Sequence, residues 1–178
     1  GRHEIRSTHG AQLDALAGAV PNLSWAGATS RPRYFQIRGI GERSHYAGEG
    51  PPSFAVGFVL DDVDLSGLGS AGLLFDLDQV EVFKGPQSTI FGPNSMAGLI
   101  SLRSAAPSGV LDGRLSTTAG TDETLGMEGS VSVPAGDNLA LRLGYAASRS
   151  NGFRTNEYLN RDDTNRRRES VARLKALY

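Results

Sequence analysis

The side chains best suited to chemistry in this chain of 178 residues are carboxylates and histidines. Carboxylates are the ligands that Ca²⁺ prefers, and one stretch of the chain is rich in them: Asp61, Asp62, Asp64, Asp76 and Asp78. Their spacing does not match a twelve-residue calcium loop with its terminal glutamate. We therefore expect these aspartates to serve turn conformations rather than to bind a metal.

The histidines and hydroxyls do not form a recognisable site either. His3, His9 and His45 have no second histidine three or four residues away. No Ser-His-Asp or Cys-His arrangement is apparent, and the absence of cysteine excludes thiolate metal sites. The segment "FGPNSMAG" lacks the lysine and hydroxyl of a phosphate-binding P-loop. We expect neither an enzyme nor a bound metal or cofactor.

The charge pattern argues against nucleic acid as a partner. The net charge is −1, so no overall attraction to a polyanion is expected. The basic run "RRRES" at 166–170 contains Glu169 and follows Asp162 and Asp163. The run is more typical of a long polar loop and the start of a strand.

The first half of the chain alternates short elements with glycine- and proline-rich loops. Apolar residues at helical spacing predict a helix that begins near Thr8 and ends before Pro21. A short β-prone run, "RYFQIRGI", precedes the loop "GERSHYAGEGPP". In "FAVGFVLDDVDLSG" we expect a strand with one apolar face and a tight turn at Asp61-Asp62.

In the segment "VEVFKGPQSTIFGPNSMAGLISLRS", residues 80–104, glycine and proline residues separate several short elements. Val80, Val82 and Phe83 predict a strand that Gly85-Pro86 interrupts. Pro86 suits the first turn of a helix that continues through Gln87 to Phe91. The run Gly92-Pro93-Asn94 ends that helix, and "GLISLRS" predicts a second strand.

After residue 108 the sequence changes to four segments that alternate between apolar and polar residues. They are "VLDGRLSTTAG", "TLGMEGSVSVP", "NLALRLGYAASR" and "ESVARLKALY". Each has the length of about ten residues that a tilted transmembrane strand needs. The second and third are joined by the short "PAGDN", and the third and fourth by the long "SNGFRTNEYLNRDDTNRR". This is the pattern of an outer-membrane barrel, although a soluble sandwich also alternates.

Four segments of the chain resemble the plug domain of the TonB-dependent outer-membrane receptors. They are "LDALAGAVPNLSW", "FQIRGIG", "VGFVLDDVDL" and "QVEVFKGPQSTIFGPNSMAGLISLRS". Lys84 stands where arginine is commoner in the family. The resemblance implies an α+β plug domain, a small mixed sheet with short helices, over residues 1–108. The first four antiparallel strands of a transmembrane β-barrel are then expected over residues 109–178.

The resemblance also implies that part of the receptor is missing. The energy-coupling segment of the family has no counterpart before Gly1, and a barrel of about twenty-two strands is expected where this chain offers four. We therefore expect a fragment of a receptor that imports a scarce ligand by energy-coupled gating. The family's commonest cargo is a ferric siderophore, with cobalamin, haem and oligosaccharides as open alternatives.

The partners and site residues implied by the resemblance are as follows. The partners are TonB, through the missing segment, a small-molecule ligand and the lipid of the Gram-negative outer membrane. Ligand contacts are expected from Arg43, His45, Tyr46, Glu49, Leu68 and Ser70, and a latch between plug and barrel from Arg38, Glu81 and Lys84. Ordinary surface charge remains an equal explanation for the latch residues. The alternative to the receptor is a soluble, β-rich secreted binding module.

Overall fold

The computed structural model describes most of the chain as two compact units. The described residues are 17–18, 20–26, 34–42, 54–66, 74–136, 138–151, 155–160, 164 and 166–178. The first unit runs from Gly1 to Ser104 and the second from Ala105 to Tyr178. The helix expected before Pro21 lies almost wholly outside the described residues.

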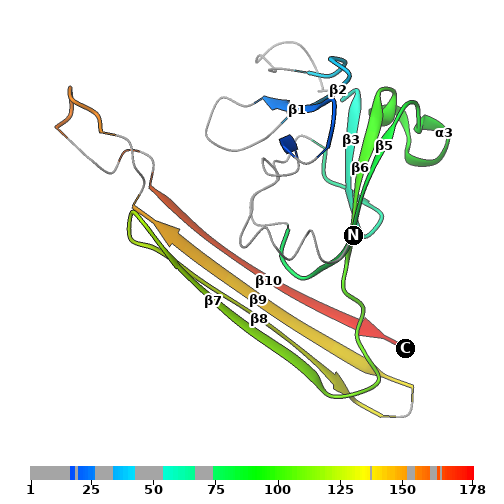
Figure 1. Ribbon diagram of the computed structural model, residues 1–178. Coiled ribbons are helices and arrows are strands. Elements are labelled where there is room, and N and C mark those ends of the chain that lie inside the picture. The colour runs from blue at the N-terminus through cyan, green and yellow to red at the C-terminus, as the bar shows by residue number, and fades with distance from the viewer. Residues whose placement is uncertain are drawn as a thin grey trace. The chain divides into compact units, whose positions relative to one another are not determined.

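The first unit contains a mixed four-stranded sheet and a two-stranded ribbon (Figure 1). The sheet has the order β4-β3-β6-β5, and β3 and β6 are parallel while the outer pairs are antiparallel. Its strands are β3 (Val56–Leu60), β4 (Val63–Asp64), β5 (Leu77–Lys84) and β6 (Gly98–Ser104). The ribbon pairs β1 (Leu23–Ala26) with β2 (Tyr34–Ile37) in antiparallel register.

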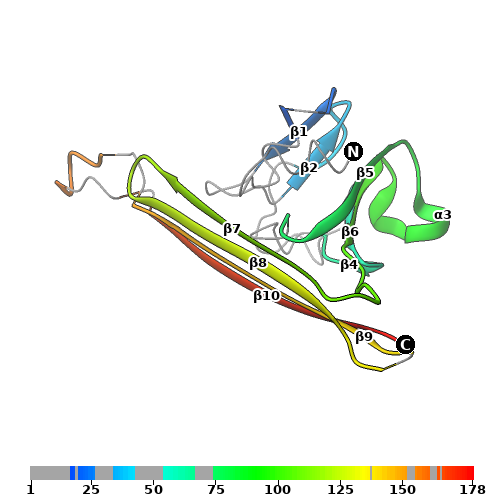
Figure 2. The same cartoon turned by 60° about the horizontal axis from the view of Figure 1, so that its bottom comes forward.

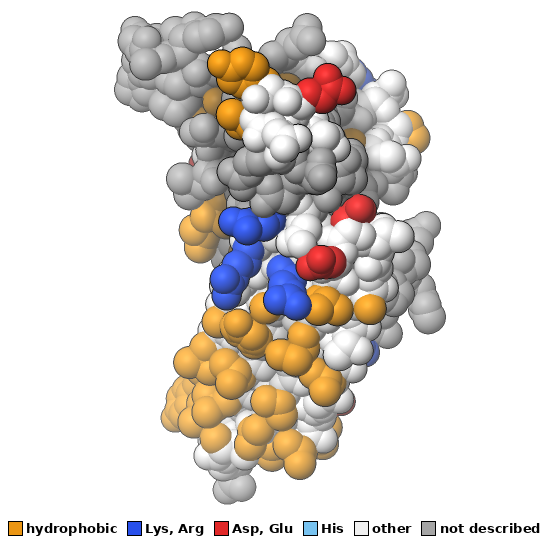
Figure 3. Space-filling view, turned by 90° about the vertical axis from the view of Figure 1, so that its left-hand side faces the viewer, with side chains coloured by type: hydrophobic (Ala, Val, Ile, Leu, Met, Phe, Trp, Pro, Cys, Tyr) orange, Lys and Arg blue, Asp and Glu red, His pale blue; other side chains and the backbone are white. Residues whose placement is uncertain are grey.

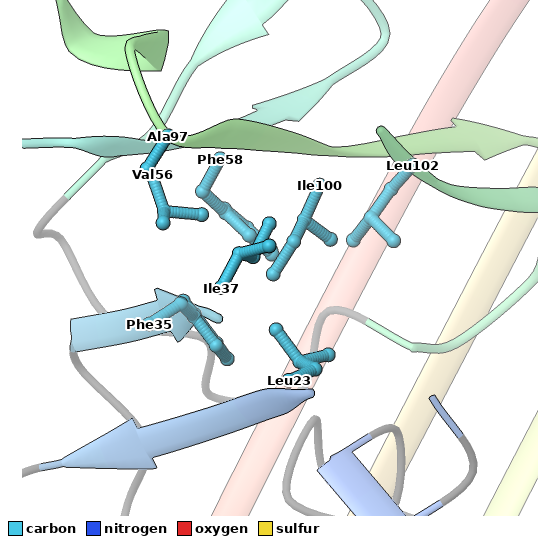
Figure 4. Packing of buried hydrophobic residues seen from close by; sticks show 8 residues of the cluster. All are labelled: Leu23, Phe35, Ile37, Val56, Phe58, Ala97, Ile100 and Leu102. Atoms are coloured by element: carbon cyan, nitrogen blue, oxygen red, sulfur yellow. The ribbon is translucent and has the colours of Figure 1, made fainter. Parts of the chain in front are cut away.

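The core of the first unit lies between the ribbon and the sheet (Figure 4). Its buried members are Leu23, Phe35, Ile37, Val56, Phe58, Ala97, Ile100 and Leu102. The rings of Phe35 and Phe58 stack with centroids 5.8 Å apart. Val59 is buried as well as Phe58, so β3 is covered on both faces rather than on the one expected. The cause is its central position beside a parallel neighbour, where strands are covered on both sides.

The expected turn at Asp61-Asp62 is confirmed. β3 and β4 form an antiparallel hairpin in which Leu60 pairs with Val63. Asp61 and Asp62 both have positive φ, at 47° and 67°, as the central residues of a type I′ turn require. Aspartate tolerates this left-handed conformation better than most residues, which explains how the turn forms without glycine.

The segment between β5 and β6 is held by its own backbone hydrogen bonds. The helix α3 (Ser88–Phe91) is a single turn with Gln87 as its N-cap, followed by the 3₁₀ turn η1 (Pro93–Ser95). Pro86 therefore precedes the cap instead of lying in the first turn. The Gly85 N–H donates to the Ala97 carbonyl at 3.0 Å, and the Gln87 N–H to the Ser95 carbonyl at 2.9 Å. These bonds close the segment into a compact loop at the end of β5 and β6.

Gly98 begins β6 at a point where no side chain fits. A Cβ there would lie 2.4 Å from the Phe83 carbonyl oxygen on β5 and 2.5 Å from Cδ1 of Ile37. The backbone oxygen cannot move without breaking the β5–β6 pairing. Glycine at this position therefore permits the close approach of the two strands.

The second unit is an antiparallel sheet of four long strands in the order β10-β9-β8-β7 (Figures 1 and 2). The strands are β7 (Asp112–Gly120), β8 (Thr124–Pro134), β9 (Ala140–Ser150) and β10 (Arg167–Leu177). Each strand lies beside its neighbours in sequence, and the four expected alternating segments are confirmed as strands. Three of them are 11 residues long.

Among the described residues, no helix has the length and apolar character needed to cross a membrane.

Candidate functional site

One face of the sheet β7–β10 is apolar and exposed. The register aligns Val131 on β8 with Leu143 on β9, and Leu143 with Leu174 on β10. Because opposed residues point to the same side of a sheet, the expected apolar sets of the strands share one face. Leu115 and Leu174 on this face are 72% and 71% exposed. Figure 3 shows apolar side chains gathered on this part of the surface, with Lys and Arg side chains along their border.

The other face of the same sheet carries polar side chains that bond to one another. The Arg142 guanidinium on β9 donates to the Ser132 hydroxyl and to the Ser130 hydroxyl, both at 2.8 Å. Ser132 is fully buried, so its partner matters because an unsatisfied buried hydroxyl is costly. The sheet therefore has one face suited to a hydrocarbon environment and one suited to a polar interior.

One end of the sheet is tied by contacts between the β7–β8 turn and the end of β9. The Asn151 N–H donates to the Asp122 carbonyl at 2.9 Å, and its side-chain amide donates to the Glu123 carboxylate at 2.7 Å. Asp122 and Glu123 have positive φ values of 56° and 52°. The contacts from Asn151 help hold this uncommon conformation and fix the end from which the long β9–β10 connection leaves.

In the first unit, Asn94 joins the loop after β5 to the β3–β4 hairpin. Its side-chain oxygen accepts a hydrogen bond from the Phe54 N–H at 3.2 Å, and its side-chain nitrogen donates to Asp64 at 3.1 Å. Asp64 also accepts from the Ser66 N–H at 2.9 Å. The Ala97 N–H donates to the Ala55 carbonyl at 2.7 Å. The loop between β5 and β6 is thus attached to the residues that precede β3 and to the end of β4.

The Asp64 carboxylate is held in its charged form. Partial burial raises its pKa, but hydrogen bonds from the Ser66 side chain, the Ser66 N–H and Asn94 lower it more. The net effect is a pKa below the ordinary value of 3.8. Hydrogen bonds to the ionised form produce such a shift, so the charge of Asp64 helps attach the loop.

A second attachment joins the hairpin to the end of β6. Asp61 accepts hydrogen bonds from the Ser104 N–H, at 2.9 Å, and from the Ser104 hydroxyl. The Asp61 N–H donates to the Leu102 carbonyl at 3.0 Å. Ser104 is the last residue of the first unit, so Asp61 fixes the point where the chain leaves it.

The residues expected to form a latch do not form one cluster among themselves. Glu81 and Lys84 lie three positions apart on β5, so their side chains point to opposite faces of the strand. Glu81 accepts a hydrogen bond from the Gln79 side chain at 2.9 Å. Arg38 follows β2, exposed and with a φ of 54°. Within the described ranges no ion pair joins any two of the three.

The residues expected to contact ligand all lie outside the described residues. They are Arg43, His45, Tyr46, Glu49, Leu68 and Ser70. The part of the chain that the structure describes contains no group of three or more His, Asp or Glu side chains able to hold a metal ion. The described residues therefore show hydrogen bonds that hold together the loops and strands of the first unit, and a sheet in the second unit with one apolar and one polar face.

Sequence reasoning missed the attaching role of Asn94, Asp61 and Arg142. Local sequence predicts Asn94 as part of a helix stop and Asp61 as a turn residue, and both do occupy such positions. Their partners Phe54 and Ser104 are 40 and 43 residues away, so no local signal could identify them. Arg142 was assigned to the correct face, but its serine partners depend on the strand register.

Comparison with known families and solved structures shows which proteins share this fold. The family model of the TonB-dependent receptor plug domain matches residues 1–99, which is more than half of the chain. The chain is similar in fold to the ferric yersiniabactin uptake receptor FyuA from Yersinia pestis, with a TM-score of 0.76 and 20% identity. This match covers 92% of the chain and 25% of the receptor.

Two further solved structures have the same fold. The pyoverdine outer-membrane receptor FpvA from Pseudomonas aeruginosa matches with a TM-score of 0.64 and 20% identity, over 83% of the chain and 21% of FpvA. The ferric-catecholate import receptor Fiu from E. coli matches with a TM-score of 0.66 and 20% identity, over 87% of the chain and 21% of Fiu. The chain thus spans about a quarter or less of the lengths of these receptors.

Proposed function

This chain belongs to the family of TonB-dependent receptor plug domains, and we propose that it supplies the plug and first barrel strands of a receptor that imports a ferric siderophore. The plug comprises residues 1–108 and the barrel strands residues 109–178. The receptor lies in the outer membrane of a Gram-negative bacterium and uses TonB as its energy source. The proposed cargo is inferred from the matched receptors, because the names of FyuA and Fiu specify ferric yersiniabactin and ferric catecholates.

The observation that supports a membrane location is that the sheet β7–β10 has one apolar and one polar face. Leu115, Leu143 and Leu174 are 72%, 53% and 71% exposed on one face, while Arg142 bonds to two serines on the other. Transmembrane barrels alternate in this way between lipid and a polar interior. A soluble secreted binding module, the alternative, would need to cover the apolar face.

The site residues are assigned by the same proposal. Arg43, His45, Tyr46, Glu49, Leu68 and Ser70 contact the arriving ligand, and Arg38, Glu81 and Lys84 attach the plug to carboxylates or polar groups of the barrel wall. The opposite orientations of Glu81 and Lys84 on β5 mean that each bonds to a different partner. The role of this chain is to bind and to gate, while energy comes from the proton gradient through TonB.

The experiment that tests the function is uptake of radioactive iron by the host with and without the gene that encodes this chain. Ferric siderophores of the catecholate, hydroxamate and mixed-ligand classes are supplied one at a time. The expected result is loss of uptake for one class, restored by the intact gene and abolished by a protonophore. Unchanged uptake of every class overturns the siderophore assignment. Parallel assays with cobalamin, haem and oligosaccharides then test the remaining cargo classes.

A further inference from the structure

Two arginines lie directly opposite each other at one end of the apolar sheet face. Arg149 near the end of β9 pairs with Arg168 near the start of β10. Opposed residues of antiparallel strands have Cα atoms about 4.5 to 5.5 Å apart and side chains on the same side. Arg149 follows Leu143 and Tyr145 at even spacing, and Arg168 precedes Leu174 at even spacing. Both guanidinium groups therefore project from the apolar face.

This pairing is unfavourable unless an anion lies between the two side chains. Like charges directly opposite each other destabilise a sheet. Within the described residues, neither Arg149 nor Arg168 has an ion-pair partner, and both are exposed. Glu169 lies beside Arg168 but points to the opposite face, and Glu123 accepts a hydrogen bond from Asn151. A phosphate that accepts from both guanidinium groups would replace their repulsion by two charge-assisted, bidentate contacts.

The position of the pair along the strand corresponds to the level of lipid headgroups. Arg149 and Leu141 are eight residues apart on the apolar face of β9, which is about 27 Å along the strand. With a tilt of about 40°, this becomes about 20 Å across the membrane, close to the apolar band of about 25 Å in outer-membrane barrels. The apolar side chains between them would lie in hydrocarbon and the arginines at its border.

The connection at this end indicates the leaflet. β9 and β10 are joined by residues 151–166, whereas β8 and β9 are joined by residues 135–139. Long loops of outer-membrane barrels face outward and short turns face the periplasm. The arginine pair is therefore at the outer leaflet, whose lipopolysaccharide carries phosphates on its lipid anchor.

We propose that Arg149 and Arg168 together bind a phosphate group of the lipopolysaccharide lipid anchor, while its acyl chains cover the apolar face of β9 and β10. This inference rests on the proposed outer-membrane location and adds a specific lipid partner to it. The pair acts as a headgroup clamp, in which planar guanidinium groups and not charge alone provide the recognition.

The test is binding of the full chain to vesicles, measured by flotation. Three vesicle types are used: phosphatidylcholine alone, phosphatidylcholine with the phosphorylated lipid anchor, and phosphatidylcholine with the same anchor after removal of its phosphates. The expected result is tighter binding to the phosphorylated vesicles only. Arg149→Ala and Arg168→Ala each weaken that binding about fivefold at low salt, as expected for one basic residue at an anionic surface.

Two controls separate the clamp from general charge. Arg114→Ala removes the same charge from the polar face of β7 and leaves vesicle binding unchanged. Arg149→Lys combined with Arg168→Lys keeps both charges but loses the bidentate geometry, so it retains only part of the phosphate-dependent gain.

The outcomes distinguish the two proposals. Equal binding to phosphorylated and dephosphorylated vesicles, or equal losses from Arg114→Ala and Arg149→Ala, overturns the clamp and leaves the membrane location standing. Failure of the folded chain to float with any vesicle overturns both, because the apolar face is then not a lipid-binding surface.

Discussion

Asp61 and Ser104 are 43 residues apart in sequence and joined by two hydrogen bonds, from the Ser104 N–H at 2.9 Å and from its hydroxyl. The pair connects the β3–β4 turn to the last residue of β6. Residue 105 begins the second unit, so this contact defines where the plug sheet ends. The Asp61 backbone contributes as well, because its N–H donates to the Leu102 carbonyl at 3.0 Å.

Replacing Asp61 by alanine should destabilise the first unit. A hydrogen-bonded charged group contributes roughly 1.5 to 3 kcal/mol, so Asp61→Ala is expected to lower the free energy of unfolding by about 2 kcal/mol. The measurement is denaturant unfolding of the full chain in detergent, followed by the fluorescence of Trp25, the single tryptophan. Asp62→Ala is the matched control, since Asp62 also has positive φ, at 67°, in the same turn. Equal effects of the two changes would mean that turn strain, not the contact to Ser104, is responsible.

Stability of the first unit should decrease in acid because of Asp64. Its pKa is lowered in the folded chain, since burial, which raises it, is outweighed by hydrogen bonds from Ser66 and Asn94. A lowered folded pKa adds stability that is complete above the unfolded value and is lost as the pH falls through the folded value. The loss is therefore expected below the ordinary value of 3.8.

The Asp64 prediction is tested by melting temperature as a function of pH, for the wild type and for Asn94→Ala. The variant lacks one of the hydrogen bonds that lower the pKa, so its melting temperature should vary less below about pH 4. An identical acid dependence in wild type, Asn94→Ala and Asp64→Asn would show that Asp64 does not contribute.

Gly98→Ala should disrupt the contact between β5 and β6. The new Cβ would lie 2.4 Å from the Phe83 carbonyl oxygen, and overpacking of this kind costs about 1 to 3 kcal/mol. Gly109→Ala is the control because no atom lies within 4 Å of the Cβ position there. The same Trp25 unfolding measurement applies. A Gly98→Ala chain as stable as Gly109→Ala would mean that β5 can shift freely.

A charge on the apolar face of β10 should weaken membrane binding, while the same charge on the polar face should not. Leu174→Lys places an ammonium among exposed apolar side chains, at a cost of about 2 to 4 kcal/mol near the middle of the bilayer. Val171→Lys makes a comparable change on the opposite face of the strand. Flotation with phosphatidylcholine vesicles should show loss of binding for the first variant only. Equal loss for both would contradict the assignment of the faces.

Local patterns were sufficient for the strands and for several turns. The alternation in "NLALRLGYAASR" predicted which side chains of β9 share a face, because successive residues of a strand point to opposite sides. The positions of Asp61-Asp62 and Gly92 were likewise predicted from turn chemistry. In each case the preference arises from residues adjacent in the chain, so the sequence carries the information directly.

Strand order and long-range contacts could not be predicted in this way. The parallel pairing of β3 with β6 places Phe58 beside Ile100, and it buries β3 on both faces where one was expected. The hydrogen bond from Phe54 to Asn94 spans 40 residues. Such contacts depend on which strands become neighbours. The alternation of apolar and polar residues within one strand does not indicate which strand will lie beside it.

The sequence by itself determined the faces of the long strands and the family resemblance of the segment at 80–104. These depend on side-chain type and short spacing, which local sterics and burial convert into structure. The tertiary structure alone decided the attachments of Asp61 and Asn94 and the opposition of Arg149 and Arg168. The physical reason is register: a shift of one residue between β9 and β10 would separate the arginines onto opposite faces.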